Sequence, residues 1–296
     1  MIELSIIILS YNTKDLTRRC IQSVRKQYKK ELIDKKLEII VIDNNSSDDS
    51  ASLLSDLKKE ILASRRSGSN FTLIQNRENL GFAKGCNFGA KNAKGKYLLF
   101  LNSDTTVLDR GFLRMTEFLD NHKEAGILGG RLLNPNGTPQ RSGGKFYNLW
   151  YLFLMLLGLE VLVRRSPTKI DKIDWVSGAC LMIGKNQFNN LSGFDEHFFM
   201  YIEDMELCYR MRKLGFSTYF YPFVGIEHKT LGSSNRSFAI INIYKGILYF
   251  YSKHKNHLEY LVAKTLLISK AEILILVGFL TFSSGLRDRY RKAVMF

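Results

Sequence analysis

The sequence has few acidic residues for its length, few cysteines and no apolar run of membrane-spanning length. Its 296 residues include 28 Asp and Glu against 43 Lys and Arg, for a net charge of +15. This basic surplus favours polyanionic partners, namely nucleic acid, an anionic membrane or a phosphorylated substrate, and charge alone does not choose among them. The four cysteines are widely spaced and form no C-x-x-C pair, which argues against a zinc site or a disulfide framework and fits a reducing compartment.

The N-terminus does not have the pattern of a secretory signal peptide. It begins MIELSIIILSYN, with an acid at Glu3 and a short apolar run, but without a basic start or a small-residue cleavage site. We expect residues 4–9 to form a buried first strand instead. The sequence contains no low-complexity run and no solenoid-type repeat. With 45% hydrophobic and 24% charged residues, the chain should fold around a sizeable core in one large or two modest domains.

The first third of the chain alternates between strand and helix patterns. Strands are predicted at 4–9, 37–43, 70–76 and 96–101. Helices are predicted at 15–28, at 80–92, and from the polar loop 44–50, which caps that helix, to about 62. This order predicts a doubly wound, mostly parallel α/β sheet. Because ligands bind beyond the carboxyl ends of the strands in such sheets, the polar residues after each strand should gather on one rim. These residues are Ser10–Asn12, Asp43–Asn45, Asn76–Arg77 and Asn102–Asp104.

Three glycines line one face of the predicted helix at 80–92. Gly81, Gly85 and Gly89 recur at a spacing of four. This is not the G-x-G-x-x-G spacing of a dinucleotide site. Two uses stay open for these glycines. The commoner one is close packing against the sheet, and the other is close approach of a ligand, which the flanking polar residues favour.

A pair of acids, Glu203 and Asp204, opens a predicted helix that runs to about Lys213. Acids in the first turn of a helix are common because they favour the positive end of its dipole, so a simple helix cap is the alternative to a catalytic role. Glu206 and Arg210 are four residues apart and predict an ordinary surface ion pair. His228 follows later and is either structural or a ligand.

Two apolar segments, at 149–163 and 258–282, are too short or too interrupted by charge to span a bilayer as helices. Each is predicted either to pack internally or to lie in a membrane interface, where Trp150 and Tyr151 would be amphipathic anchors and Arg164 with Arg165 would face lipid phosphate. An oligomer contact is a further use for the second segment. Between the predicted sheet and these helices, the turn-rich stretch 131–147 predicts a surface loop.

Taken together, the motifs resemble those of one known family. Their order and spacing resemble the inverting glycosyltransferases of family 2, which have the GT-A fold, and most of all the rhamnosyltransferase-type subgroup. The resemblance runs from residue 2 to about residue 235. The matching motifs are SYN at 10–12, VIDNNSSD at 41–48, N-x-G-F-A-x-G-x-N-x-G at 79–89, LNSD at 101–104, FFMYIEDMELCYR at 198–210 and the late histidine.

The resemblance implies a domain division and a role for each matching residue. A GT-A domain would span 1–235, with a nucleotide-binding half at about 1–104 and an acceptor half at about 105–235, and a helical segment would follow at 236–296. Asp204 would be the catalytic base, and Asp104 with His228 would hold Mn²⁺ or Mg²⁺. The donor would be bound by Tyr11, Asn12, Asp43, Asn79, Asn102 and Asp104. The acceptor would be bound by Trp175 and Glu203.

One position departs from the family pattern. Asn102 stands where the D-x-D motif has its first acid, although the rhamnosyltransferase-like subgroup often has N-x-D there. The departure is physically tolerable, because Mg²⁺ sites often use only one or two carboxylates and take the remaining ligands from substrate phosphates and water. We therefore expect Asp104 to be a metal ligand rather than a residue that merely ends a strand, and we expect metal binding to be weak without nucleotide.

The function implied is transfer of a sugar, with rhamnose as a guess from the subgroup, from a UDP- or dTDP-linked donor to a hydroxyl of a glycan or lipid-linked glycan. Such an enzyme of cell-surface polysaccharide synthesis would lie in the cytoplasm, peripheral on the inner face of an anionic membrane, without a nucleic-acid partner; a homo-oligomer stays open. A sugar-phosphate nucleotidyltransferase is one alternative, but SYNTKDL lacks the glycine of a phosphate loop. A non-catalytic basic module for membrane or RNA is the other, and it leaves the acids on the rim unexplained.

Overall fold

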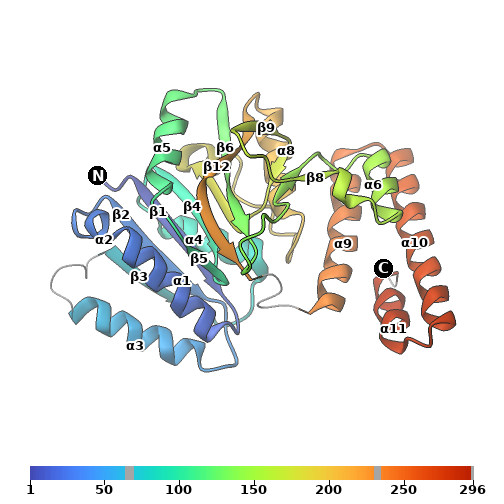
Figure 1. Ribbon diagram of the computed structural model, residues 1–296, viewed down its shortest axis with the longest axis horizontal. Coiled ribbons are helices and arrows are strands. Elements are labelled where there is room, and N and C mark those ends of the chain that lie inside the picture. Colours follow the sequence, from blue (N-terminus) through green and yellow to red (C-terminus); the bar gives the residue numbers. More distant parts are fainter. Residues whose placement is uncertain (64–69, 230–234, 295–296) are drawn as a thin grey trace.

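A nine-stranded sheet forms the centre of the protein, as the computed structural model shows for residues 1–63, 70–229 and 235–294 (Figure 1). The strand order is β3-β2-β1-β4-β11-β6-β12-β5, and β9 pairs with β12. The strands are β1 (Leu4–Ser10), β2 (Leu37–Asp43), β3 (Phe71–Gln75), β4 (Tyr97–Asn102), β5 (Thr105–Val107), β6 (Ala125–Leu133), β9 (Asp171–Ile173), β11 (Cys180–Gly184) and β12 (Ser217–His228).

The first four strands in the order are parallel, as the alternating sequence pattern predicted. Ser10 pairs with Asp43, and Leu9 pairs with Asn102, so the polar ends of β1, β2 and β4 lie at one edge. Beyond β4 the sheet becomes mixed, because β11 runs antiparallel to both β4 and β6. The predicted α/β class is confirmed, and β2 is buried along its whole length because helices cover both faces.

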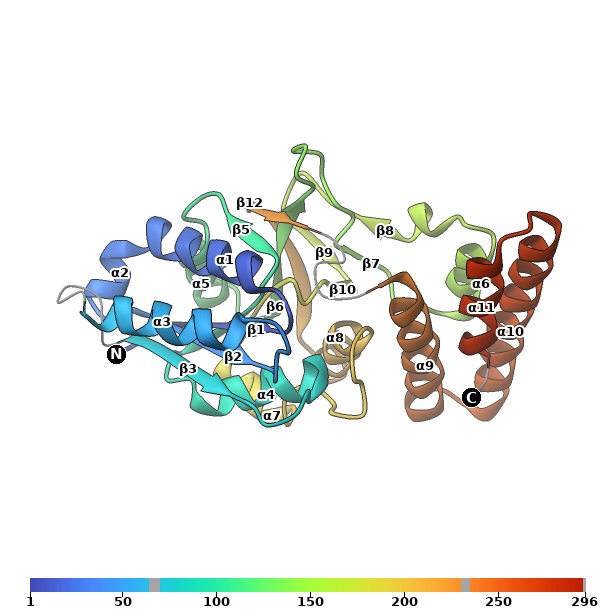
Figure 2. The same ribbon diagram turned by 90° about the horizontal axis from the view of Figure 1, so that it is seen from below.

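Helices cover the two faces of the sheet in two groups (Figure 2). One core cluster joins the sheet to α1, α3 and α5, and the other joins it to α4, α7 and α8. A short helix, α2, follows α1. The bounds are α1 (Lys14–Gln27), α2 (Lys29–Ile33), α3 (Ser50–Ala63), α4 (Gly81–Asn92), α5 (Phe112–Asn121), α7 (Lys185–Asn190) and α8 (Glu203–Lys213).

The glycines of α4 serve packing. A Cβ atom at Gly85 would lie 2.6 Å from the side chain of Leu9, and one at Gly89 would lie 2.6 Å from Ile42. Both contacts are shorter than real side chains allow, so any larger residue would displace either the Leu9 and Ile42 side chains or α4 itself. Of the two uses that the sequence left open for these positions, the structure favours close packing.

A small antiparallel sheet lies between the main sheet and the C-terminal helices. It contains β7 (Gly143–Gly144), β8 (Arg164–Arg165) and β10 (Trp175–Val176). A Cβ atom at Gly144 would lie 2.3 Å from the carbonyl oxygen of Val163, so the strands can approach only because this residue is glycine. The prediction of a surface loop at 131–147 is therefore wrong at its buried β7 strand and at its start, which belongs to β6.

The C-terminal helices form a layer beside α8 (Figures 1 and 2). They are α9 (Arg236–His254), α10 (His257–Leu280) and α11 (Ser284–Ala293). The helix α6 (Leu149–Leu156) packs on α10, and Lys270 Nζ donates to the carbonyl oxygen of Met155 at 2.7 Å. No helix in the described part of the chain is long and apolar enough to cross a membrane.

The apolar segment at 149–163 is partly packed and partly exposed. Leu152 is only 1% exposed, whereas Trp150 is 61% exposed. The same division runs along α10, where Ala263 and Leu267 are buried and Leu258 and Leu280 are exposed. Each segment therefore uses one face to hold the helical layer together and leaves an apolar face outward.

Candidate active site

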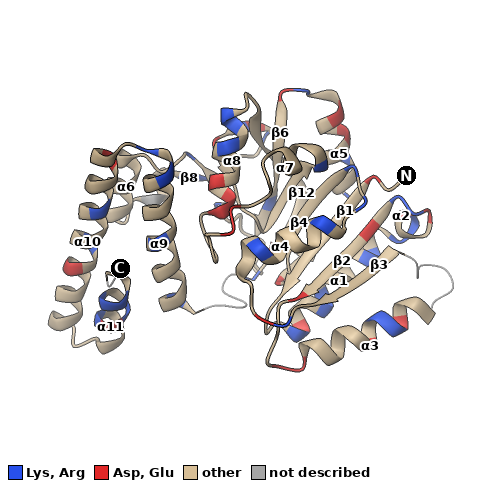
Figure 3. Cartoon of the chain, turned by 180° about the vertical axis from the view of Figure 1, so that it is seen from behind, with Lys and Arg blue, Asp and Glu red and all other residues tan. Residues whose placement is uncertain are grey.

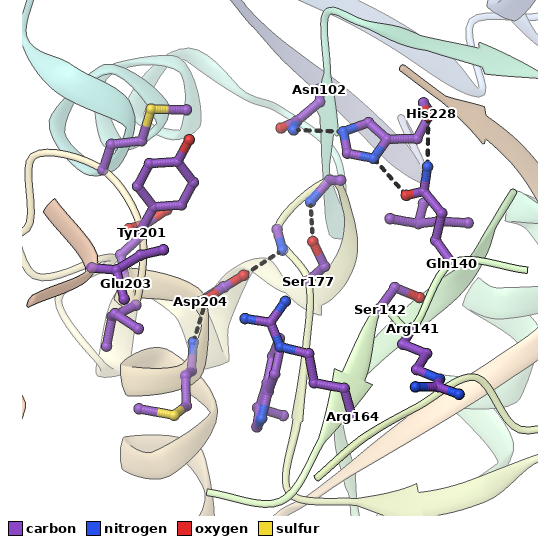
Figure 4. Close-up of a pocket in the computed structure, with 18 of the residues that line it drawn as sticks. Asn102, Gln140, Arg141, Ser142, Arg164, Ser177, Tyr201, Glu203, Asp204 and His228 are labelled. Atoms are coloured by element: carbon purple, nitrogen blue, oxygen red, sulfur yellow. Dashed lines mark hydrogen bonds between the residues drawn. The ribbon is translucent and has the colours of Figure 1, made fainter. Parts of the chain in front are cut away.

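A cavity of about 680 Å³ opens where the ends of β4 and β12 meet the start of α8 (Figure 4). Five of the residues predicted for the site line it, namely Asn102, Trp175, Glu203, Asp204 and His228. They come from the rim of the sheet, from the small sheet and from α8. The fold therefore brings together the D-x-D-like position, the acid pair and the late histidine, which are far apart in the sequence.

His228 links the end of β12 to the residues after β4. Its Nε2 atom lies 3.3 Å from Asp104 Oδ1 and 3.5 Å from Asn102 Nδ2. On the other side of the ring, Gln140 Oε1 lies 2.9 Å from His228 Nδ1. The amide nitrogen of Gln140 donates to the carbonyl oxygen of His228 at 2.7 Å and to Asn134 Oδ1 at 3.0 Å, which assigns the amide orientation.

This network assigns the protonation pattern of the imidazole. An amide oxygen only accepts hydrogen bonds, so Nδ1 of His228 carries a proton that it donates to Gln140. In the neutral ring, Nε2 then presents its lone pair toward Asp104. Two electron-rich atoms face each other across 3.3 Å, and a proton or a metal cation between them stabilises that arrangement. Gln140 was not singled out from the sequence, because nothing in its spacing links it to His228.

Asp204 is the second residue of α8 and lies in the cavity wall. The backbone N–H of Gly178 donates to its Oδ2 at 2.9 Å, and that of Met205 donates to its Oδ1 at 2.7 Å. Burial raises the pKa of the Asp204 carboxyl above its ordinary value, while these hydrogen bonds and the charge of Arg164 act in the opposite direction. The result is a carboxylate of fixed orientation with a stronger affinity for a proton than a solvated aspartate has.

Glu203 is the buried neighbour of Asp204. Its side chain is 5% exposed, and its Oε2 atom has no hydrogen-bond partner within the described residues. Burial, and then the neighbouring charge of Asp204, raises the pKa of the Glu203 carboxyl well above its usual range. Of the two acids, Glu203 has the larger upward shift of its pKa, so Glu203 favours the protonated form more strongly than Asp204 does.

The turn before α8 is strained. Tyr201 and Ile202 have φ angles of 71° and 73°, in the left-handed region that bulky residues rarely adopt. Each such residue costs on the order of 1–3 kcal/mol, so the surrounding structure must impose this conformation. The strain lies next to the acid pair and sets where α8 begins, and both residues line the cavity with Glu203 and Asp204.

Arg164 lies in the cavity wall beside Trp175. Its Nη2 donates to the hydroxyl of Tyr147 at 2.9 Å, and its guanidinium carbon lies 5.7 Å from the centre of the Trp175 ring. The next residue, Arg165, pairs with Asp171 at 3.0 Å. The membrane-interface alternative for this segment put both arginines at lipid phosphate, but the alternation along β8 sends Arg164 into the cavity and Arg165 to another partner.

A second cavity of about 280 Å³ adjoins the first and contains Tyr11 and Asn79, two of the predicted donor-binding residues. Phe82 and Met200 line both cavities. Asn79 Oδ1 accepts from Asn44 Nδ2 at 2.8 Å, which ties the start of α4 to the loop after β2. The two cavities together provide a continuous lining from the first strand to the acid pair.

Asp43 and Asn12 support the loops at this edge. Ser46 Oγ donates to Asp43 Oδ1 at 2.6 Å, and Asp43 is only 2% exposed. Asn12 has a φ of 52°, and its Oδ1 accepts from the backbone N–H of Ser47 at 2.7 Å. These bonds join the loop after β1 to the loop after β2. Both side chains are engaged with protein partners, and neither is among the residues that line the two cavities.

Glu206 and Arg210 do not form the surface pair that their spacing predicted. Glu206 is fully buried and accepts from Arg210 Nε, from Lys253 Nζ at 2.8 Å and from His254 Nε2 at 2.9 Å. Burial raises the pKa of Glu206, but its three cationic and hydrogen-bonded partners outweigh burial, so the net shift is downward. The cluster joins α8 to α9. Spacing within one helix could not reveal the residues that another helix contributes.

The sheet order, the carboxylate on its rim and the acid pair across the cavity are the arrangement of a GT-A glycosyltransferase. The family model described as glycosyl transferase family 2 matches residues 5–204, and the chain belongs to that family. The fold expectation is therefore confirmed.

Two relatives illustrate the range of the similarity. The O-antigen biosynthesis protein RfbC of Myxococcus xanthus is 33% identical over 134 residues, which cover 44% of this chain and 10% of RfbC. The low-salt glycan biosynthesis hexosyltransferase Agl10 of Haloferax volcanii is 25% identical over 215 residues, which cover 71% of this chain and 62% of Agl10. The chain thus spans less than two thirds of either relative.

Solved structures show the same fold at lower identity. A structure of GalNAc-T7 with UDP, GalNAc and Mn²⁺ has a TM-score of 0.63 at 18% identity and covers 85% of this chain and 50% of that one. The mannosyltransferase PcManGT of Pyrobaculum calidifontis, solved with GDP-Man and Mn²⁺, has a TM-score of 0.59 at 14% identity and covers 99% of this chain and 85% of that one. At such identity the likeness shows the fold alone.

Proposed function

We propose that this chain is an inverting hexosyltransferase that moves a sugar from a nucleoside-diphosphate donor to an acceptor hydroxyl. The observation that carries the proposal is the cavity that both Asp204 and His228 line, with the carboxylate of Asp104 directly behind it, 3.3 Å from His228 Nε2. In such an arrangement a base for the acceptor would lie opposite a group that can hold the donor's diphosphate. Membership of family 2 supports the reaction class.

Asp204 would act as the general base. Its two hydrogen bonds to backbone N–H groups fix the carboxylate, and burial raises its pKa so that it takes a proton more readily than a solvated aspartate. An acceptor hydroxyl that donates to Asp204 would attack the anomeric carbon from the face opposite the leaving diphosphate. The neutral Glu203 beside it would orient the acceptor without competing for the proton. Inversion follows from this single displacement.

The residues present fit a divalent metal ion at the diphosphate side. Asp104 supplies a carboxylate oxygen and His228 supplies Nε2, which Gln140 orients. An oxygen and an imidazole ligand suit Mn²⁺, and Mg²⁺ also accepts few protein ligands when substrate phosphates and water complete its shell. When bound, the metal would stabilise the negative charge of the departing diphosphate. Asn102, next to His228, would hydrogen-bond neutral sugar or ribose groups.

The donor's nucleoside would occupy the smaller cavity, which Tyr11 and Asn79 line. Asp43 and Asn12 would shape its edge through the loops that they hold. UDP- and dTDP-linked sugars are the proposed donors. One relative, an N-acetylglucosaminyl-diphospho-decaprenol L-rhamnosyltransferase of Mycobacterium tuberculosis, is 36% identical over 64 residues, which cover 22% of this chain and 21% of the relative, and it supports rhamnose as a first sugar to try.

The acceptor would be a glycan or a lipid-linked glycan in the synthesis of a cell-surface polysaccharide. Trp175, whose indole N–H donates to the carbonyl oxygen of Lys145 at 2.9 Å, presents a fixed ring to the cavity and would stack on an acceptor sugar. The names of RfbC and Agl10 support glycan assembly. The domain from 1 to about 235 would carry the reaction, with the donor in its first half and the acceptor in its second.

The helical segment at 236–296 would hold the enzyme on the inner face of the cell membrane. Its support is the outward apolar face of α10 together with the basic α11 (Figure 3). Basic side chains next to an apolar face favour an anionic lipid surface. Flotation with vesicles should depend on anionic lipid and fall with salt, because screening acts over roughly 10 Å at 0.1 M. A protein that floats with none of the vesicles would contradict membrane attachment.

The reaction itself is tested with a panel of nucleotide sugars. The purified chain is incubated with each donor and Mn²⁺, and nucleotide release is measured without acceptor, where slow hydrolysis is expected for the correct donor. Release of a nucleoside diphosphate supports a glycosyltransferase, whereas formation of a nucleotide sugar from a sugar phosphate and a nucleoside triphosphate would show a nucleotidyltransferase. Failure with every donor, with and without an extract of lipid-linked glycans, would contradict the proposed function.

A further inference from the structure

We propose that the large cavity contains a phosphate subsite for the acceptor, centred on Arg164, and that the acceptor is a sugar joined through a phosphate or diphosphate to a lipid. The inference rests on the proposed function and names its acceptor class. Three features carry it, namely the position of Arg164, a second arginine with a buried hydroxyl in the same cavity, and an apolar segment that continues the cavity wall.

Arg164 is built into the wall rather than lying loosely on a surface. Its Nη2 donates to the Tyr147 hydroxyl, and its guanidinium lies 5.7 Å from the centre of the Trp175 ring. Such contacts hold the planar guanidinium in one orientation, and a fixed guanidinium can donate two parallel hydrogen bonds to one phosphate. The arginine reaches into the cavity beside Asp204 (Figure 4).

The place of Arg164 assigns it to the acceptor rather than to the donor. The proposed base, Asp204, takes its proton from the acceptor, so a cation beside the base lies next to the acceptor sugar. The donor's diphosphate would lie with Asp104 and His228 at the ends of β4 and β12. Phosphate would then bind in two separate places, one on each side of the reacting carbon.

Arg141 and Ser142 extend the subsite along the same cavity. Ser142 is only 6% exposed, and its Oγ atom has no hydrogen-bond partner within the described residues. A buried hydroxyl without a partner costs on the order of 1–3 kcal/mol, so a ligand that accepts a hydrogen bond from it would relieve that cost. A phosphate oxygen is an acceptor for this hydroxyl and for both guanidinium groups.

The cavity wall continues into an exposed apolar segment. Val161 lines the cavity and is 46% exposed, and it lies in the short 3-10 helix η2 (Glu160–Leu162) that directly precedes β8. Leu157, Leu159 and Leu162 are 59%, 41% and 63% exposed. Along the wall, the proposed base Asp204 is therefore followed by the cation Arg164 and then by the apolar surface that begins at Val161. This order matches an acceptor with a sugar, a phosphate and a hydrocarbon chain, whereas a soluble sugar phosphate would leave the apolar part unused.

Calorimetry with three probes tests the subsite. Farnesyl diphosphate, farnesol and inorganic pyrophosphate are titrated into the full chain in EDTA, where the donor side has no metal to hold a diphosphate. Farnesyl diphosphate is expected to bind more tightly than either other probe, because only it fills both the cationic and the apolar parts. If farnesol binds as tightly as farnesyl diphosphate, the cavity has no phosphate subsite. If pyrophosphate binds as tightly as farnesyl diphosphate, the acceptor's lipid does not contribute to binding.

Two neighbouring arginines provide a matched pair of variants. Arg164→Gln should weaken farnesyl diphosphate binding by roughly tenfold to a hundredfold, as expected for the loss of hydrogen bonds to a charged group. Arg165 pairs with Asp171 instead, so Arg165→Gln should change the affinity for farnesyl diphosphate little. Equal effects of the two variants would overturn the role of Arg164.

Two controls separate the possible failures. Arg164→Lys keeps the charge but cannot bind two phosphate oxygens at once, so its affinity for farnesyl diphosphate should lie between those of the wild type and Arg164→Gln. Arg164→Lys also takes the place of Arg164→Gln if that variant does not fold. Donor hydrolysis with Mn²⁺ on the same preparation reports the proposed function independently. Normal hydrolysis with no preference for farnesyl diphosphate would overturn the subsite alone.

Discussion

Nε2 of His228 lies 3.3 Å from Oδ1 of Asp104, so the end of the longest strand meets the turn that follows β4. Both atoms are of kinds that bind metal ions in proteins, and the Gln140 amide on the far side of the neutral ring leaves the lone pair of Nε2 directed toward the carboxylate. In the proposed function, this pair would hold the metal and the diphosphate of a donor although Asn102 stands in place of the usual first acid.

Removing either member of this pair should abolish the metal-dependent part of nucleotide binding. Asp104→Ala and His228→Ala are titrated with nucleoside diphosphate, with and without Mn²⁺, by calorimetry. The control is His122→Ala, which removes an imidazole that stacks on Phe118 with ring centres 3.9 Å apart, away from the site. If both site variants bind nucleotide with undiminished dependence on Mn²⁺, neither residue belongs to a metal site.

Gln140 should matter for metal affinity although it does not touch the metal. Gln140→Leu keeps a similar volume but removes the acceptor for His228 Nδ1, so the ring is free to turn or to change tautomer. The loss of such a supporting contact typically weakens metal binding by about 10- to 100-fold. ¹⁵N NMR of the His228 ring in the metal-free protein reads the tautomer directly. An unchanged tautomer in the variant would show that Gln140 does not set it.

Glu206 should be a major contributor to stability. Glu206→Gln leaves Arg210, Lys253 and His254 around a neutral group, and removing one partner from a buried charge network costs about 3–5 kcal/mol. Urea denaturation measures the loss. The control is Asp56→Asn, whose carboxylate is 70% exposed and pairs with Lys59, and which should change stability by less than about 1 kcal/mol. Similar losses in the two variants would contradict the role of the buried cluster.

Glu203→Gln should stabilise the protein at neutral and higher pH. Burial raises the folded-state pKa of Glu203 well above its ordinary value of 4.5, so the unfolded state loses this proton first as pH rises. Between the two pKa values the folded state binds more protons, and stability falls with increasing pH. The glutamine side chain does not titrate, so its contribution to stability does not change with pH. Thermal melts should therefore coincide below the unfolded pKa and favour the variant above it; a variant that is less stable at every pH would contradict a neutral Glu203.

Much of the first half of the fold could be predicted from the sequence, because its signals are local. β2 is a β-branched run that is buried on both faces, and the polar residues after β1, β2 and β4 lie on one rim because parallel strands place their carboxyl ends together. The start of α8 at Glu203 was also predicted, since an acid pair marks a helix N-terminus. These features depend on residues close together in the chain.

The parts that could not be predicted depend on contacts between distant segments. Glu206 has the spacing of a surface pair with Arg210, and only the approach of α9 makes it the centre of a buried cluster. Arg164 and Arg165 are adjacent and identical in type, yet one lines the cavity and the other pairs with Asp171. A strand of two residues has no periodicity from which the inward side could be predicted.

Transfer by the Asp204→Asn variant is the most direct test of the account. Asparagine keeps the size of the side chain and one acceptor for the N–H of Gly178, but it cannot take a proton. Transfer should fall by roughly 10²–10⁴-fold, the usual contribution of a general base, while donor binding stays near that of the wild type. Burial raises the pKa of Asp204 above its ordinary value of 3.8. As the pH falls, Asp204 should therefore become protonated, and wild-type transfer should be lost, at a higher pH than for a solvated aspartate. Glu203→Gln should lower the rate of transfer less than Asp204→Asn does. If Asp204→Asn transfers sugar at near the wild-type rate, Asp204 is only part of a helix cap and the proposed mechanism is wrong.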